Sequence, residues 1–216
     1  MNIFKSYNDL IESNNFERLQ KIFTRYDMFK KIVDIPGDIV ECGVFKGTGQ
    51  IFWLKLLRIF DEHSMKKVIG FDTFNYFPKS ILKYEKKEAK KFIKESGYQG
   101  VSVKEINNKI KRIGLEERSE LIKGDIVKSS AKYVKNNKGF RISLLNLDLD
   151  TYEGTKAALE NFYPLVSKNG IIIFDEYGKR GWGETDAVDE FFKKKKNVKI
   201  RNIKYSNQPS AYILKK

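Results

Sequence analysis

Four acidic residues end two apolar segments in the second half of the chain. Asp148 and Asp150 end the first segment, and Asp175 and Glu176 end the second. Carboxylates at close range repel one another unless a positive charge lies among them. A divalent cation held by oxygen ligands would supply that charge. The alternative, ordinary strand-end acids facing water, suits a single acid better than two such pairs.

Two neighbouring parallel strands would bring these acids together. Residues 142–147 and 171–174 are short apolar runs typical of buried strands, and the amphipathic segment between them predicts a helix. The carboxyl ends of parallel strands meet at one edge of a sheet, where open α/β sheets bind their ligands. We therefore expect the four acids at a ligand-binding edge.

A glycine-rich loop follows another predicted strand, residues 38–42. The loop, 43–49, precedes an apolar helical stretch, so its backbone can approach a ligand closely and the helix offers free N–H groups. Its spacing, E-x-G-x-x-x-G-x-G, differs from the G-x-G-x-x-G pattern of dinucleotide-binding enzymes, and the sequence has no G-x-x-x-x-G-K-[ST] loop. A typical nicotinamide site and a P-loop NTPase are therefore disfavoured. Asp72, at the end of the next strand, is placed to accept hydrogen bonds from ribose hydroxyls.

The remaining elements follow from periodicity and from turn residues. We expect a third strand at 119–123 that leads to Asp125, and a closing antiparallel pair at 198–205 and 211–214. The patterns predict helices at 1–33, 83–95, 103–113, 126–136 and 186–196.

Composition narrows the functional class. The 216 residues suit one domain, and 42 Lys+Arg against 28 Asp+Glu give a net charge of +14. This charge suggests anionic partners, or a lysine-rich surface with no specific role; the lysines are scattered, so we expect no nucleic acid partner. A single cysteine, Cys42, and the lack of a signal-like or membrane-spanning segment predict a cytoplasmic protein.

The motifs DIVECGVFKGTG, FDTF, LDLDTYEGTKAALENFYPLVSKNGIIIFDEYG and AVDEFF cover about residues 36 to 192. With them the chain resembles the class I S-adenosylmethionine-dependent methyltransferases, and within that class the macrocin O-methyltransferase (TylF-like) family of sugar O-methyltransferases. The resemblance implies an α/β, Rossmann-like fold: a seven-stranded, mostly parallel sheet with helices on both faces. We expect one domain, 1–216, in which 1–35 is a helical lid or oligomer segment and 75–118 is an insertion near the substrate edge.

The resemblance also implies roles for individual residues. S-adenosylmethionine would lie against the glycine loop and the following strand ends, and the family's divalent ion is usually Mg²⁺. Asp150 would be the general base, because the histidine thought to serve some relatives has no counterpart here: His63 lies at the wrong end of its βαβ unit. The implied metal ligands are Asp148, Asp175 and Glu176, where some relatives carry Asp in place of Glu176. The implied cofactor contacts are Glu41, Gly43, Val44, Phe45, Lys46, Gly47, Thr48, Gly49, Asp72, Thr73, Asp125, Ile126 and Asp148.

The expected reaction is methylation of a sugar hydroxyl on a nucleotide sugar, a glycan or a glycosylated metabolite. The aromatic residues Tyr152, Tyr177 and Trp182 are candidate sugar contacts or core residues, and Lys179 and Arg180 are either diphosphate ligands or solvated loop residues. The alternatives are a catechol-like or RNA acceptor, a nicotinamide-dependent oxidoreductase, and a non-catalytic binding protein. A homo-oligomer is possible.

Overall fold

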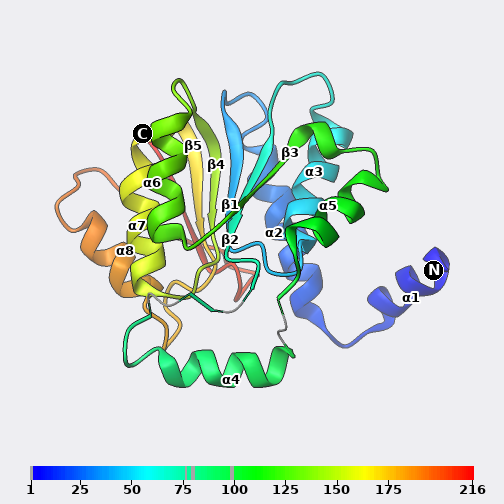
Figure 1. Cartoon of the computed structure of the whole chain (residues 1–216), viewed down its shortest axis with the longest axis horizontal. Coiled ribbons are helices and arrows are strands. Elements are labelled where there is room, and N and C mark those ends of the chain that lie inside the picture. Colours follow the sequence, from blue (N-terminus) through cyan, green and yellow to red (C-terminus); the bar gives the residue numbers. More distant parts are fainter. Residues whose placement is uncertain (1, 76, 79–80, 98–99) are drawn as a thin grey trace.

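One mixed sheet with helices on both faces forms the centre of the molecule (Figure 1). The structure, a computed structural model, describes residues 2–75, 77–78, 81–97 and 100–216. The strand order is β3-β2-β1-β4-β5-β7-β6; the first five strands run parallel, and β7 and β6 are antiparallel to their neighbours. This confirms the predicted fold class, including the antiparallel end.

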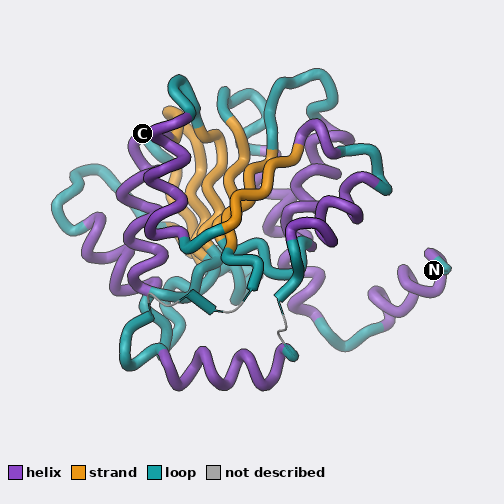
Figure 2. Tube along the Cα trace, in the orientation of Figure 1, coloured by secondary structure: helices purple, strands orange, loops and turns teal. Residues whose placement is uncertain are grey.

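The strands lie between the helices (Figure 2). The strands are β1 (Asp38–Cys42), β2 (Val68–Asp72), β3 (Ser119–Lys123), β4 (Ile142–Leu147), β5 (Val166–Phe174), β6 (Arg201–Asn202) and β7 (Ala211–Leu214). The helices are α1 (Ile3–Glu12), α2 (Phe16–Lys30), α3 (Thr48–Phe60), α4 (Lys86–Ser96), α5 (Val103–Lys111), α6 (Ile126–Asn136), α7 (Tyr152–Phe162) and α8 (Glu184–Phe192), with two 3₁₀ turns, Glu116–Arg118 and Tyr163–Leu165.

The sheet is apolar on both faces because helices cover both. Successive residues of a strand point to opposite faces: Val40 packs in the cluster that includes residues of α6, α7 and α8, and Ile39 packs in the cluster that includes residues of α2, α3 and α5. This alternation places Glu41 on the α2 and α3 side. The parallel strands therefore end at one edge, and their last residues are held by two packed layers.

Several predicted bounds are wrong. The expected helix over 1–33 is two helices, because Asn15 caps α2: its Oδ1 accepts a hydrogen bond from Arg18 N at 3.4 Å. The strand expected at 198–205 shrinks to β6, and Val198 and Ile200 pack on the core without joining the sheet. The helix expected at 186–196 is α8, which ends before the lysine run Lys193–Lys196.

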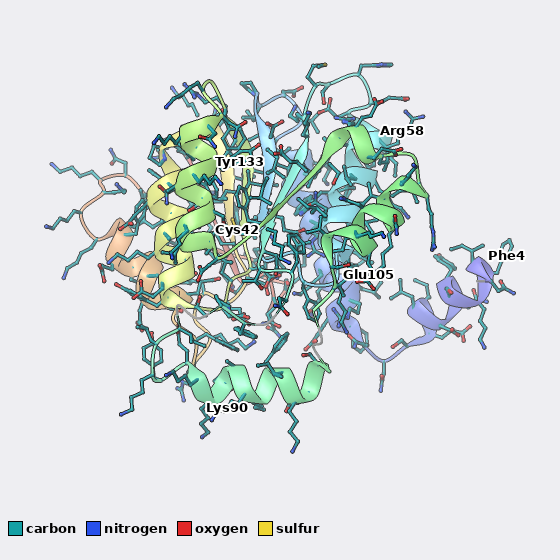
Figure 3. All side chains as sticks on the ribbon, viewed as in Figure 1. Phe4, Cys42, Arg58, Lys90, Glu105 and Tyr133 are labelled. Carbon is teal, nitrogen blue, oxygen red and sulfur yellow. The ribbon has the colours of Figure 1, made fainter. Side chains whose placement is uncertain are left out.

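Helix α1 lies apart from the sheet (Figures 1 and 3). Its apolar side chains Ile3, Phe4, Tyr7 and Ile11 are exposed, and Phe4 retains 80% of its accessible surface. In the described part of the chain, no helix is long and apolar enough to cross a membrane.

Candidate active site

A cavity of about 520 Å³ lies where the parallel strands end. Ten of the predicted site residues line it: Gly43, Phe45, Lys46, Asp72, Thr73, Ile126, Asp148, Asp150, Asp175 and Glu176. The others are placed outside the lining formed by the described residues: Glu41, Val44, Gly47, Thr48, Gly49 and Asp125. The parallel strand topology thus brings the glycine loop, the ribose-type acid and the acidic pairs around one space.

Asp72 holds the glycine loop in place. Its Oδ2 accepts hydrogen bonds from the backbone N–H groups of Val44 and Phe45, both at 2.9 Å. Gly43 has φ +95°, and a Cβ there would lie 1.8 Å from the Asp148 carbonyl oxygen. Only glycine therefore allows the loop to approach the end of β4 so closely.

Glu41 lies beneath this loop. It is 1% exposed, its carboxylate is 3.8 Å from Arg25 Nη2, and a Cβ at Gly49 would lie 2.0 Å from its Oε1. Burial raises the pKa of Glu41 to about 8, although Arg25 opposes the shift. Glu41 thus packs closely against Gly49, the last residue of the glycine loop.

The acidic cluster at the sheet edge is largely buried. Asp175 is 2% exposed, Glu176 is 4% exposed, and Glu184 is fully buried. Glu184, which sequence reasoning did not single out, accepts a hydrogen bond from Glu176 N at 2.8 Å. Burial, and then the charge of Glu176, raise the pKa of Glu184 well above its usual range. Burial, followed by Asp148, raises the pKa of Asp175 to about 7.

Asp150 follows β4 with its backbone in the left-handed region, at φ +62°. Burial, followed by the neighbouring Glu176 carboxyl group, raises the pKa of Asp150 well above its usual range. Asp150 becomes a base only when a nearby positive charge favours its ionised form.

Two lysines neutralise part of the cluster. Lys21, from α2, places its Nζ 3.3 Å from Asp175 Oδ2 and 3.9 Å from Asp148 Oδ2. Burial lowers the pKa of Lys21, but Asp148 and Asp175 outweigh it and raise the pKa overall. Lys179 Nζ lies 2.6 Å from Glu176 Oε1. Sequence reasoning missed Lys21 because the contact with Asp175 joins residues 154 positions apart.

The donor set suits a hard divalent cation in its chemistry. Asp148, Asp175 and Glu176 offer carboxylate oxygens, and Asp175 Oδ1 is buried with no hydrogen-bond partner in the structure. The arrangement of these side chains, however, does not suit a bound metal ion. Among the residues that the structure describes, no three acidic, histidine or cysteine side chains are placed to hold a metal ion. The space between Asp148 and Asp175 holds a lysine ammonium instead.

Aromatic residues that line the same cavity form an aromatic wall. Phe77 stacks on Trp182 with ring centroids 5.9 Å apart, and Phe92 of α4 packs against Phe77 at 5.6 Å and against Phe45 at 5.8 Å. Lys90 lies on the side of α4 that points away from the sheet (Figure 3). Helix α4 therefore contributes to the cavity wall with Phe92 and with the polar or charged residues Glu88, Lys91, Glu95 and Ser96.

The remaining aromatic candidates have other partners. Tyr177 donates its hydroxyl hydrogen bond to Asp189 at 2.8 Å, and the Tyr152 hydroxyl contacts Glu190. Trp182 is the one of the three candidates that lines the cavity.

Glu85 attaches the segment before α4 to the body of the protein. It is fully buried and accepts hydrogen bonds from Tyr152 N at 2.6 Å and from Leu82 N at 2.7 Å. Because Tyr152 is the first residue of α7, Glu85 satisfies a helix N-terminus from a distant part of the chain. This acid had no recognisable signal in the sequence.

Comparison with known proteins identifies the family. The family model described as Macrocin-O-methyltransferase (TylF) matches residues 13–208. The chain belongs to the macrocin O-methyltransferase family. That membership confirms the resemblance seen in the motifs.

Similar proteins of this family methylate natural products. Over 144 residues the chain is 28% identical to the 8-demethyl-8-(2,3-dimethoxy-alpha-L-rhamnosyl)-tetracenomycin-C 4'-O-methyltransferase of Streptomyces olivaceus, covering 66% of this chain and 54% of the relative. It is 28% identical over 171 residues to the demethyldecarbamoylnovobiocin O-methyltransferase of Streptomyces niveus, and the match covers 73% of this chain and 59% of that relative. The chain thus spans little more than half the length of these relatives. The solved O-methyltransferase NovP has a TM-score of 0.76 and 24% identity, and the match covers 92% of this chain and 79% of NovP, which supports the fold.

Proposed function

We propose that this chain is an S-adenosylmethionine-dependent, divalent-metal-dependent O-methyltransferase that acts on a sugar hydroxyl. One observation carries the proposal: a single cavity is lined by the glycine loop and Asp72 on one side and by Asp148, Asp150 and Asp175 on the other. A methyl donor and a hydroxyl acceptor need such adjacent sites. The rhamnosyl group in the name of the Streptomyces olivaceus relative favours a sugar acceptor.

The cavity fits the methyl donor in its chemistry. Asp72 lies at its wall with one oxygen bound to the loop amides, so the carboxylate is fixed in position to accept ribose hydroxyl hydrogen bonds. Gly43 packs closely against the end of β4 and has no Cβ, so no side chain at this position separates the loop backbone from the ligand. Ile126 begins α6, and Asp125 caps that helix by accepting from Val127 N at 3.1 Å, which shapes the adenine side.

Methyl transfer requires alignment and removal of one proton. The acceptor oxygen forms a bond to the methyl carbon as the carbon–sulfur bond breaks, and the electron pair of that bond goes to sulfur. In our proposal the cavity walls align the two partners, and Asp150 takes the hydroxyl proton. Burial raises the pKa of Asp150, so added positive charge at the cluster would favour the ionised form of Asp150 that can accept a proton.

The proposed metal ligands are Asp148, Asp175 and Glu176. A bound Mg²⁺ would lower the pKa of an adjacent sugar hydroxyl and orient it. This role requires Lys21 to leave its position between Asp148 and Asp175.

The aromatic wall is the proposed surface for the sugar face. Trp182 and Phe77 line the same cavity as the acids, and aromatic rings offer an apolar face to the C–H groups of a sugar. Lys179 lines the same cavity and is a candidate for the diphosphate of a nucleotide sugar, provided that it exchanges its contact with Glu176. A role in polysaccharide or antibiotic biosynthesis, a cytoplasmic location and a homo-oligomer stay predictions.

Calorimetric titration with S-adenosylmethionine, its demethylated product and NAD, each with and without Mg²⁺, tests the class. We expect micromolar binding of the methyl donor or its product, and a large loss in Asp72→Ala. The matched control is Asp61→Ala, which removes an acid paired with Lys66 away from the cavity. Binding of NAD without binding of the methyl donor would replace the methyltransferase proposal with the oxidoreductase alternative.

A further inference from the structure

The Lys21 ammonium bridges the two strand ends that carry the acids. It lies 3.3 Å from Asp175 Oδ2 at the end of β5 and 3.9 Å from Asp148 Oδ2 at the end of β4. The Lys21 side chain is 21% exposed and the Asp175 side chain 3%. Such a pair is shielded from water on most sides, so its charges interact more strongly than they would on an open surface.

The same face of α2 carries a second half-buried cation. Arg25, four residues after Lys21, pairs with Glu41 at 3.8 Å. Residues four apart lie on one side of a helix. Helix α2 therefore contacts the carboxyl edge of the sheet through two cation–carboxylate contacts, besides the buried side chains of Met28 and Phe29 further along.

We propose that the Lys21 ammonium occupies the place of a divalent cation between Asp148 and Asp175, so that metal binding and the α2 contact exclude each other. The inference rests on the metal-binding part of the proposed function. A divalent cation needs the same carboxylate oxygens at direct-contact distance. An ammonium that stayed among those oxygens would compete for their lone pairs and would repel the incoming ion.

Helix α2 would respond when the metal enters. Glu17, Arg18 and Lys21 line the cavity, so this helix forms part of its wall. Displacement of Lys21 removes one of the contacts that hold the wall against the sheet. By linkage, any ligand that holds Lys21 in place weakens metal binding by the factor by which the metal weakens that ligand.

Manganese titration of the wild type and of Lys21→Met tests the competition. We expect Lys21→Met to bind Mn²⁺ about tenfold more tightly, as removal of a competing positive charge at this range predicts. Lys30→Met is the matched control: it lies on the same helix, pairs with Asp27 at 3.2 Å and is not part of the cavity wall. It should leave Mn²⁺ affinity unchanged. Lys21→Gln, which keeps a polar side chain, should change in the same direction as Lys21→Met and decides the matter if the methionine variant does not fold.

Hydrogen exchange gives an independent readout that needs no turnover. Mn²⁺ should speed amide exchange in residues 16–30 of the wild type, and it should have little effect on these amides in Lys21→Met. Equal or weaker Mn²⁺ binding by both Lys21 variants would overturn the inference and leave the metal site standing. If none of these proteins, Lys21 variants included, binds Mn²⁺ at millimolar concentration, the metal site and the inference are overturned together. Because no step uses the methyl donor, failure of the donor assignment is detected separately.

Discussion

Glu41 is a buried carboxyl group whose ionisation opposes folding. Its pKa is about 8 in the folded protein, against an ordinary value of 4.5. Between these two values the folded protein holds a proton that the unfolded chain has released. The free energy of unfolding must therefore fall as pH rises through this window. The contribution of protonated Glu41 to the free energy of unfolding is fully present below pH 4.5 and is lost as the pH rises to about 8.

The size of the effect follows from the two pKa values. Each pH unit inside the window changes the free energy of unfolding by at most ~1.4 kcal/mol. The two pKa values of Glu41 differ by about 3.5, so the whole window is worth about 5 kcal/mol. Glu41 is 1% exposed, so solvent screening does not reduce this figure appreciably.

Glu41→Gln isolates this contribution, because an amide of the same shape does not ionise. Urea unfolding followed by tryptophan fluorescence, from about pH 5 to about pH 9, should show the variant gaining stability relative to wild type as pH rises. The contact with Arg25 is already contained in the folded pKa of Glu41, and because Arg25 stays charged in this range it adds no separate pH dependence. Glu160→Gln, at an exposed position, is the control and should run parallel to wild type. A difference between wild type and Glu41→Gln that stays constant from about pH 5 to about pH 8 would mean that Arg25 keeps Glu41 ionised, and the reasoning would be refuted.

Three further variants test the cavity. Asp150→Asn should abolish turnover in a product assay while methyl-donor affinity stays within about twofold of wild type, because only proton removal is lost; normal turnover would remove Asp150 from the mechanism. Gly43→Ala should lower the melting temperature and methyl-donor affinity, since its Cβ would lie 1.8 Å from the Asp148 carbonyl oxygen; unchanged binding would show that the loop can move aside. Glu85→Ala should cost about 1–3 kcal/mol in urea unfolding by leaving the N–H of Tyr152 unpaired; an unchanged midpoint would show that water replaces the carboxylate.

The sequence was sufficient to predict the parallel strands of the sheet because their signal is local. The run 142–147 is apolar throughout, and β4 has the predicted bounds. The ends of helices were harder to predict. Asn15 interrupts the expected N-terminal helix because its side chain caps α2. An Asn side chain can hydrogen-bond to nearby backbone N–H groups in this way only where the chain leaves the helical conformation. The alternation after 198 also misled, because apolar side chains at period two can pack on a helical layer without pairing in a sheet.

The acids of the site could be placed from topology, and the groups that act on them could not. Asp148 and Asp175 end neighbouring parallel strands, so their proximity follows from the strand order alone. Glu184 lies before the helix predicted at 186–196, and its burial depends on how α8 packs beside β5. Lys21 is one of many lysines, and only the docking of α2 distinguishes it from those on the surface.

Repulsion among the acids dictates that positive charge must be present, but it does not dictate which group carries that charge. In this structure the Lys21 and Lys179 ammonium groups carry part of that charge, and burial raises the pKa of Asp150, which favours its neutral form. The contacts of the two ammonium groups can be replaced by contacts with a metal cation without rebuilding the core, because side chains at the open edge of the sheet make them. The same exchange would free Asp150 to accept a proton. Charge balance at the sheet edge would thus link the proposed metal, the wall formed by α2 and the proposed base in one equilibrium.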